Sequence, residues 1–269
     1  MTRTKIEWAT HTWSPCTGCT PVSEGCLNCY ARRFAHRLRG RFGYPKDDPF
    51  RVTLRPERLA QPYRWRRGVV FVCSMGDLFH EEVPSKFIQQ VLGVAADPRN
   101  RNKIFCFLTK RSRRMCEEVL LWKRNNRSHL PSNWWLGVSV ENQERLIKRG
   151  SDLLRWNLRG AHRFISAEPL LEPLDIKQLE HGTIRLWDDL GDYIELLIVG
   201  AETGPGRRPC DIRWVRQIRD DCAMLRVRFF LKQVFVNGKK THELDGVDYS
   251  RIPPWQVFRG GQSNGSNLD

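Results

Sequence analysis

The sequence has no long apolar run. None of its 269 residues lie in a stretch that approaches the roughly 18 consecutive apolar residues of a membrane-spanning helix. The first residues, MTRTKIEWATHTW, lack the apolar core of a secretory signal peptide. We therefore expect a cytoplasmic protein that makes no contact with a membrane.

Acidic residues are scarce relative to basic ones. The chain has 30 Asp and Glu against 45 Lys and Arg, which gives a net charge of +15 and an isoelectric point near 9.8. Such an excess of positive charge indicates a polyanionic partner, with nucleic acid as the first candidate. A basic surface that only keeps the protein soluble is the alternative. Clusters of basic residues lie at 32–41, 64–67, 110–114, 123–127 and 207–208.

Apolar runs of strand length recur along the chain at regular intervals. Their starts lie 35, 30, 28, 33 and 33 residues apart, and helical patterns occupy most of the intervals. Strands that alternate with helices predict a parallel sheet with helical crossovers. The predicted strands are 69–73, 104–108, 134–140, 162–166, 195–200 and 228–231, and the predicted helices are 30–39, 84–96, 113–123, 142–156 and 212–225.

This rhythm favours an α/β fold with a complete or partial (β/α) TIM-like barrel. A further strand near residues 10–14 would bring the number of strands to about seven, and the length suits a barrel of about 250 residues. An open doubly wound sheet is the structural alternative. We expect one domain over residues 1–258, with insertions near 40–68 and 172–194. Residues 259–269 have the composition of a disordered tail.

Polar residues follow each predicted strand. In parallel α/β barrels the active site lies at the carboxyl ends of the strands, so these side chains are expected to meet there. The alternative is that these residues are polar only because strand ends are exposed to solvent. The candidate catalytic residues are Lys110, Glu168 and Lys232, and the other polar or turn positions at this edge are Gly76, Asp77, Ser139, Glu141, Gly200 and Glu202.

Four of the nine cysteines lie in one short stretch, at Cys16, Cys19, Cys26 and Cys29. A reducing cytosol disfavours disulfides, and an odd number of cysteines fits a fully paired framework poorly. The two CxxC pairs could close a structural zinc site. Alternatively, Cys19, Cys26 and Cys29 could hold an iron–sulfur cluster on the loop after the first strand, with Cys16 spare.

Eight segments between residues 4 and 233 carry a resemblance to a known family. They are TKIEWATHTWSPCTGC, VSEGCLNCYA, SMGDLFHEEVP, FLTKR, LGVSVENQ, ISAEPLLEP, IVGAETGPGRRP and FFLKQ. In these segments the chain resembles a family of bacteriophage and bacterial proteins with a radical-SAM-like three-cysteine motif. The resemblance implies a [4Fe–4S] cluster on Cys19, Cys26 and Cys29.

It also implies S-adenosylmethionine as cofactor, a protein that donates electrons, and cleavage of the cofactor to a 5′-deoxyadenosyl radical. Together with the basic charge, this predicts an enzyme that modifies or repairs a nucleic acid or nucleotide. The implied cofactor-binding positions are Gly76 and Asp77 near the methionine end, Ser139 and Glu141 near the ribose, and Gly200 and Glu202 near the adenine.

Two other functions stay open on the sequence. One is a zinc-stabilised nucleic-acid-binding protein without catalysis. The other is a DNA repair lyase or nuclease that uses the carboxylates with a divalent metal. Trp13, Trp134 and Trp135 are candidates for stacking on bases, with packing in the core as their alternative role. The basic clusters at 32–41 and 64–67 are expected near the mouth of the predicted barrel, where they would attract the polyanion.

Overall fold

The computed structural model describes residues 4, 6–181 and 194–250. The predicted tail, 259–269, lies outside the described residues, and so does most of the predicted insertion at 172–194. In the described ranges, no helix combines the length and apolar character that crossing a membrane requires.

The main sheet has eight strands in the order β1-β4-β5-β6-β7-β8-β9-β10. From β1 to β9 each strand lies parallel to its neighbour, and each new strand is added beside the one before it. Only β10 is antiparallel, because a tight hairpin joins it to β9. The strands are β1 (His11–Trp13), β4 (Gly68–Val72), β5 (Lys103–Thr109), β6 (Trp134–Val140), β7 (His162–Ala167), β8 (Leu196–Gly200), β9 (Arg228–Val236) and β10 (Lys239–Thr241).

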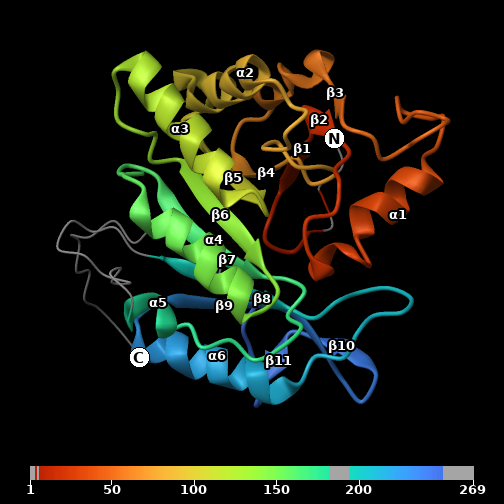
Figure 1. Cartoon of the computed structure of the whole chain (residues 1–269), viewed down its shortest axis with the longest axis vertical. Coiled ribbons are helices and arrows are strands. Elements are labelled where there is room, and N and C mark those ends of the chain that lie inside the picture. The colour runs from red at the N-terminus through yellow and green to blue at the C-terminus, as the bar shows by residue number, and fades with distance from the viewer. Residues whose placement is uncertain (1–3, 5, 182–193, 251–269) are drawn as a thin grey trace, which may run out of the picture.

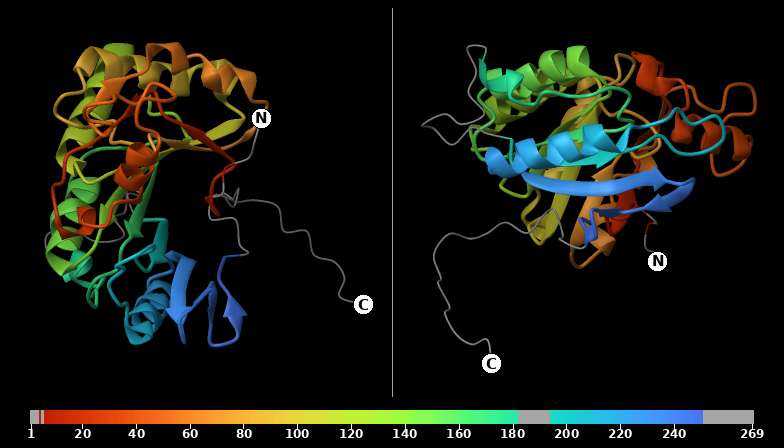
Figure 2. Two further views of the ribbon diagram at one scale, coloured as in Figure 1. Left: turned by 90° about the vertical axis from the view of Figure 1, so that its right-hand side faces the viewer. Right: turned by 90° about the horizontal axis from the view of Figure 1, so that it is seen from below.

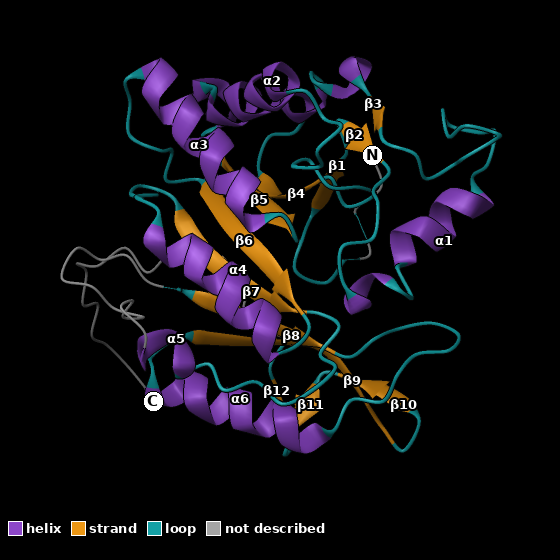
Figure 3. Ribbon diagram, viewed as in Figure 1, coloured by secondary structure: helices purple, strands orange, loops and turns teal. Residues whose placement is uncertain are grey.

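Helices α2, α3, α4 and α6 cover one face of this sheet, and α1 stands apart from them (Figures 1 and 3). The helices are α1 (Tyr30–Arg37), α2 (Ser85–Ala96), α3 (Ser112–Asn126), α4 (Gln143–Arg155), α5 (Gln178–His181) and α6 (Ile212–Met224). Two small sheets pair β2 (Cys16–Thr17) with β3 (Thr53–Leu54), and β11 (Glu243–Leu244) with β12 (Val247–Asp248).

The fold is mixed α/β with a mainly parallel sheet, consistent with a partial (β/α) barrel. A doubly wound sheet has helices on both faces and a reversal of strand order, and this sheet has a sequential order. Among the described strands, no ladder joins β10 to β1, so closure of a barrel is not shown. An ion pair of 2.8 Å between Lys240 Nζ on β10 and Glu7 Oε1 before β1 links the two edges. Figure 2 shows the curvature of the sheet, with the helices on its outer side.

Successive side chains of a strand point to opposite faces of the sheet, and this places the apolar side chains in two hydrophobic clusters. On β4, Val70 and Val72 pack in the large cluster beneath the helices, whereas Phe71 belongs to a second cluster on the concave face. A Cβ on Gly137 would lie 2.2 Å from the ring of Phe164, so the concave cluster needs glycine there. The concave cluster consists of Trp8, Ala9, Phe71, Cys106, Trp135, Phe164, Leu196, Ile198 and Phe230.

The predicted helices and the predicted strands of the main sheet are found, whereas β2, β3, β10, β11, β12 and α5 were not predicted. One predicted strand differs informatively in length. Strand β9 continues to Val236, although the predicted strand stops at residue 231. The polar residues Lys232 and Gln233 interrupt the apolar run, and both line a cavity on the concave side. Polar residues on the inner face therefore hid half of this strand from the pattern.

Candidate active site

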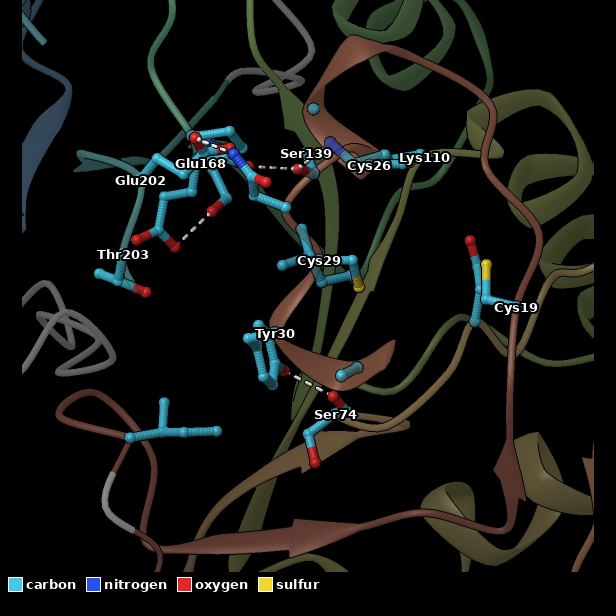
Figure 4. Close-up of a pocket in the computed structure, with 18 of the residues that line it drawn as sticks. Cys19, Cys26, Cys29, Tyr30, Ser74, Lys110, Ser139, Glu168, Glu202 and Thr203 are labelled. Carbon is cyan, nitrogen blue, oxygen red and sulfur yellow. Dashed lines mark hydrogen bonds between the residues drawn. The ribbon is translucent and has the colours of Figure 1, made fainter. Parts of the chain in front are cut away.

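A cavity of about 440 Å³ lies at the carboxyl ends of the parallel strands. Its wall combines the loop after β1, which we call the cysteine loop (residues 14–29), with residues that lie in or just after β4 to β9 (Figure 4). Ten predicted site residues border it: Cys19, Cys26, Cys29, Gly76, Asp77, Lys110, Ser139, Glu168, Glu202 and Lys232. Two predicted residues, Glu141 and Gly200, do not line it.

The cysteine loop is fixed to the end of β4 by a close contact between two glycines. Gly18 and Gly76 form a parallel β-bridge. Gly18 has a φ of +89°, and a Cβ there would lie 2.0 Å from the carbonyl oxygen of Arg51. A Cβ on Gly76 would lie 2.8 Å from the carbonyl oxygen of Gly18. Both positions therefore need glycine to bring the loop against the sheet.

The four clustered cysteines divide into three at the cavity and one in the core. Cys16 is buried, with its Sγ 3.3 Å from the Sγ of Cys73. The hydrogen bond with Cys73, together with burial, raises the pKa of Cys16 well above its ordinary value. Cys16 is absent from the cavity wall, whereas Cys19, Cys26 and Cys29 all border it.

The three thiols fit an iron–sulfur cluster in donor chemistry, because such clusters take cysteine thiolates. In the described part of the chain, no three His, Cys, Asp or Glu side chains are gathered as a metal site. Figure 4 shows Cys19 on a different stretch of the loop from Cys26 and Cys29. Binding a cluster would therefore require the loop to draw its thiols together.

Arg111, which sequence reasoning did not select, connects the cysteine loop to β5. Its Nη1 lies 3.4 Å from Cys19 Sγ and 3.2 Å from Asp77 Oδ2, and its Nε donates to Glu81 Oε2 at 2.8 Å. Burial raises the pKa of the Cys19 thiol to about 12, and Asp77 adds to this while Arg111 opposes it. Asp77 also accepts from Thr109 Oγ1 at 2.8 Å, so this carboxylate holds the end of the sheet together.

Lys110 and Glu141 form an ion pair at the ends of β5 and β6, in which Lys110 is half-buried. Lys110 Nζ donates to Ser139 Oγ at 2.9 Å and to Glu141 Oε2 at 2.8 Å. Glu141 is fully buried and also accepts from Arg149 Nη1 at 2.9 Å. Burial disfavours its charge, but Lys110 and Arg149 outweigh burial and lower the pKa of Glu141. Glu141 thus stands behind the wall and positions Lys110, which reaches the cavity.

Glu168 and Lys232 face each other across the cavity wall. Lys232 Nζ lies 3.1 Å from Glu168 Oε1, and Ser166 Oγ donates to Glu168 Oε2 at 2.9 Å. A Cβ on Gly200 would lie 2.3 Å from Glu168 Oε1, so Gly200 makes room for this carboxylate. A carboxylate and an ammonium in contact at a cavity can bind a polar substrate group or exchange a proton with it.

Comparisons with known proteins bear on this site. Residues 3–268 match the model of a family described as "Protein of unknown function (DUF5131)". The chain belongs to this family. No curated protein matches it in sequence.

One solved structure shares the fold of this family member. It is a mutant of spore photoproduct lyase with bound AdoMet and dinucleoside spore photoproduct. The TM-score is 0.53 at 10% sequence identity, and the match covers 84% of this chain and 77% of that chain. At such low identity the likeness shows a common fold alone.

Glu202 ties the loop after β8 to the cysteine loop. Asn28 Nδ2 donates to Glu202 Oε2 at 2.8 Å, and the backbone N–H of Arg208 donates to the same oxygen at 2.9 Å. Arg33 Nη2 on α1 donates to the carbonyl of Thr203 at 2.9 Å. Asn28 and Arg33 were missed because the motif was interpreted only through its cysteines. Both residues hold the cysteine loop over the cavity.

We expect Glu202→Gln to weaken the acid dependence of stability. Burial alone would raise the pKa of Glu202, but Arg208 and Asn28 lower it from 4.5 to about 2. A carboxyl group whose pKa is lower in the folded state than in the unfolded state stabilises the fold at pH values above its unfolded-state pKa. This stability is lost as the pH falls toward 2. The contribution is at most about 3 kcal/mol.

Urea unfolding between pH 7 and pH 3 checks this prediction. Wild type should be more stable than Glu202→Gln at neutral pH, and the gap should close on acidification. The matched control is Glu144→Gln, because Glu144 is an exposed glutamate on α4. A gap that is constant with pH would contradict the electrostatic role of Glu202.

Two predictions from the sequence about nucleic-acid contact are wrong, one because the residues are buried and one because they lie at the other end of the sheet. Trp13, Trp134 and Trp135 have no solvent exposure, because the first two pack beneath the helices and the third packs on the concave face. None of them can stack on a base. The basic cluster at 64–67, expected near the mouth, precedes β4 and so lies at the opposite end of the sheet.

Proposed function

We propose that this protein is a radical S-adenosylmethionine enzyme whose [4Fe–4S] cluster is held by Cys19, Cys26 and Cys29. One observation carries the proposal: these three cysteines, and not Cys16, border the cavity at the carboxyl edge of a sequentially ordered parallel sheet. The fold likeness to a lyase with bound AdoMet supports it. The relationship to the bacteriophage and bacterial three-cysteine proteins is part of the same proposal.

The proposed roles follow from where the side chains stand. When bound, the cluster supplies the electron that cleaves S-adenosylmethionine to methionine and a 5′-deoxyadenosyl radical. The cavity volume of about 440 Å³ suits a small-molecule site. Cofactor contacts are assigned to Ser139 and to the backbone at Gly76. Lys110, Glu168 and Lys232 are assigned to binding the substrate and holding a proton near it.

The remaining predicted cofactor-binding residues hold other residues of the cavity wall in place. Asp77 and Glu202 fix the cysteine loop through Arg111 and Asn28, and Glu141 and Gly200 place Lys110 and Glu168. We therefore propose these four as positioning residues for the cofactor and substrate.

The substrate is proposed to be a nucleic acid or a nucleotide. The net charge of +15 favours a polyanion, and the similar lyase structure contains a dinucleoside. A cytoplasmic protein that donates electrons is the proposed partner, because reductive cleavage of the cofactor consumes an electron.

The two alternative functions receive less support. A zinc site made of four thiolates needs Cys16, which packs against Cys73 in the core. A divalent-metal nuclease needs carboxylates that are available to the metal. Here Asp77, Glu168 and Glu202 each face a basic side chain within 3.2 Å.

Anaerobic reconstitution with iron and sulfide, followed by S-adenosylmethionine and dithionite, tests the proposal. We expect 5′-deoxyadenosine and methionine in equal amounts by mass spectrometry, and neither product without dithionite. Absence of both products from a fully loaded cluster would contradict the proposed activity. Colourless protein with one bound zinc would support the zinc-stabilised alternative.

A further inference from the structure

Helix α1 exposes its large apolar side chains and buries its small ones. Ala31 and Ala35 pack against Tyr44 and Phe50, whereas Phe34 is 49% exposed. The sequence pattern places Tyr30, Phe34 and Leu38 on one helical face, and Tyr30 and Phe34 of that face line the cavity. A helix that turns aromatic rings toward a cavity mouth indicates a binding surface rather than core packing.

The exposure is concentrated around this helix. Of the eight exposed large hydrophobic side chains among the described residues, five lie between residues 22 and 42. We call residues 22–42 the α1 rim. Tyr30 is fixed there because its hydroxyl donates to the carbonyl of Ser74 at 2.5 Å. The rim thus presents a pre-positioned aromatic surface beside the cavity.

The α1 rim also carries positive charge, and its one acidic residue, Glu24, pairs with Arg145 of α4. It contains five arginines, and no acidic residue occurs between residues 25 and 46. None of these arginines belongs to an ion pair within the described ranges, whereas Arg213, Arg216 and Arg219 on α6 all face aspartates. The α6 arginines are paired with aspartates of the protein, whereas those of the rim are available to an anion from outside.

Arginines and aromatic rings alternate on this helix. The Arg37 guanidinium lies 5.5 Å from the centre of the Phe34 ring, and Arg41 Nη2 donates to the carbonyl of Arg37. Positive groups beside a stacking surface are the combination that binds single-stranded nucleic acid, because phosphates and base faces are then contacted together. A small anionic metabolite held inside the cavity would need no further aromatic and cationic side chains on the exposed rim, such as Phe42 and Arg41.

We propose that the α1 rim binds a single-stranded stretch of nucleic acid. One base stacks on Phe34 and Tyr30, and neighbouring phosphates contact Arg37 and Arg41, so that a nucleotide is presented to the cavity. Duplex bases are stacked on each other and offer no free face, so a paired strand must first release its base. The inference rests on the proposed function, since it gives the substrate class of the same cavity.

Fluorescence anisotropy with full-length protein tests the inference. The probes are one labelled sequence as single-stranded DNA, as single-stranded RNA and as duplex DNA. We expect both single strands to bind more tightly than the duplex. Phe34→Ala should weaken single-strand binding about tenfold, and Phe34→Trp should retain it. Phe34 is exposed, so neither substitution is expected to affect folding, which circular dichroism checks.

The salt dependence separates charge from stacking. Arg37→Gln with Arg41→Gln should lower the slope of log Kd against log salt by roughly 1.4, since each single-strand phosphate contributes about 0.7. Phe34→Ala should leave that slope unchanged. The matched control is Arg101→Gln with Arg124→Gln, two exposed arginines near the opposite end of the sheet, and it should leave the single-strand preference unchanged.

Three results would overturn the inference. One is an equal loss of binding in the control and the rim variants, which would mean that net charge alone binds the strand. Another is duplex binding as tight as single-strand binding. The third is no binding to any probe, which would leave the rim for an acidic protein partner. Iron content and 5′-deoxyadenosine are measured separately, so failure of the rim and failure of the proposed chemistry are distinguishable.

Discussion

Cys26→Ala should reduce the iron of anaerobically purified protein to background, whereas Cys16→Ala should retain about four irons per chain. The reason is position: Cys26 borders the cavity, and Cys16 packs against Cys73 in the core. Iron and sulfide analysis together with visible absorbance measures the difference. The same loss is expected for Cys19→Ala and Cys29→Ala, because a cluster with an open iron uses all three thiolates.

A matched control comes from Cys210→Ala. Cys210 is half-buried like the three proposed ligands, but it does not border the cavity. Its replacement should leave the iron content unchanged. Iron loss in a folded Cys16→Ala variant would contradict the three-thiolate proposal and favour a site with four thiolates.

Arg111→Met should lower the free energy of unfolding by about 3 kcal/mol. Arg111 and Asp77 are both buried and lie 3.2 Å apart, so removal of the guanidinium leaves a buried carboxylate without its counter-charge. Thr109 and the backbone N–H of Phe79 still donate to Asp77, which moderates the loss. The midpoint of urea unfolding, at an unchanged m-value, measures the effect.

The double variant Asp77→Asn with Arg111→Met isolates the interaction. It should be less destabilised than the sum of the two single variants, because each single change alone breaks the buried pair. On α3, Arg113→Met is the surface control. Arg113 is exposed and pairs with Glu117 four residues away, so its loss should cost less than about 0.5 kcal/mol. Strict additivity of the two buried substitutions would mean that the pair does not couple.

The sequence by itself determined the order and kind of the main elements. Apolar runs and helical periods indicate which residues of a local segment are buried. The strand predicted at 134–140 accordingly has the same bounds as the observed β6 (Trp134–Val140), in which every residue is buried. The rule that parallel strands end at one edge then brought Lys110, Glu168 and Lys232 to a common cavity. This rule works because it needs only strand direction, which alternation with helices dictates.

Only the tertiary structure decided which polar residues face the cavity and which support it. Glu141 and Glu168 both follow strands, yet the first is sealed behind Lys110 and the second borders the cavity. Likewise, the helical periodicity of α1 shows which residues share a face of the helix, but not whether that face points into the core or toward solvent. Small alanines on the other side let the helix pack closely, and this turns Phe34 outward.

The cysteine loop shows why the sequence determines some features of the site and only the tertiary structure determines others. The sequence determined that Cys16, Cys19, Cys26 and Cys29 are neighbours in the chain. The contacts that separate Cys16 from the others reach across 57 residues to Cys73, and Asn28 reaches across 174 residues to Glu202. Local periodicity carries no information on such distant pairs. Their formation depends on the sheet that brings the strand ends together.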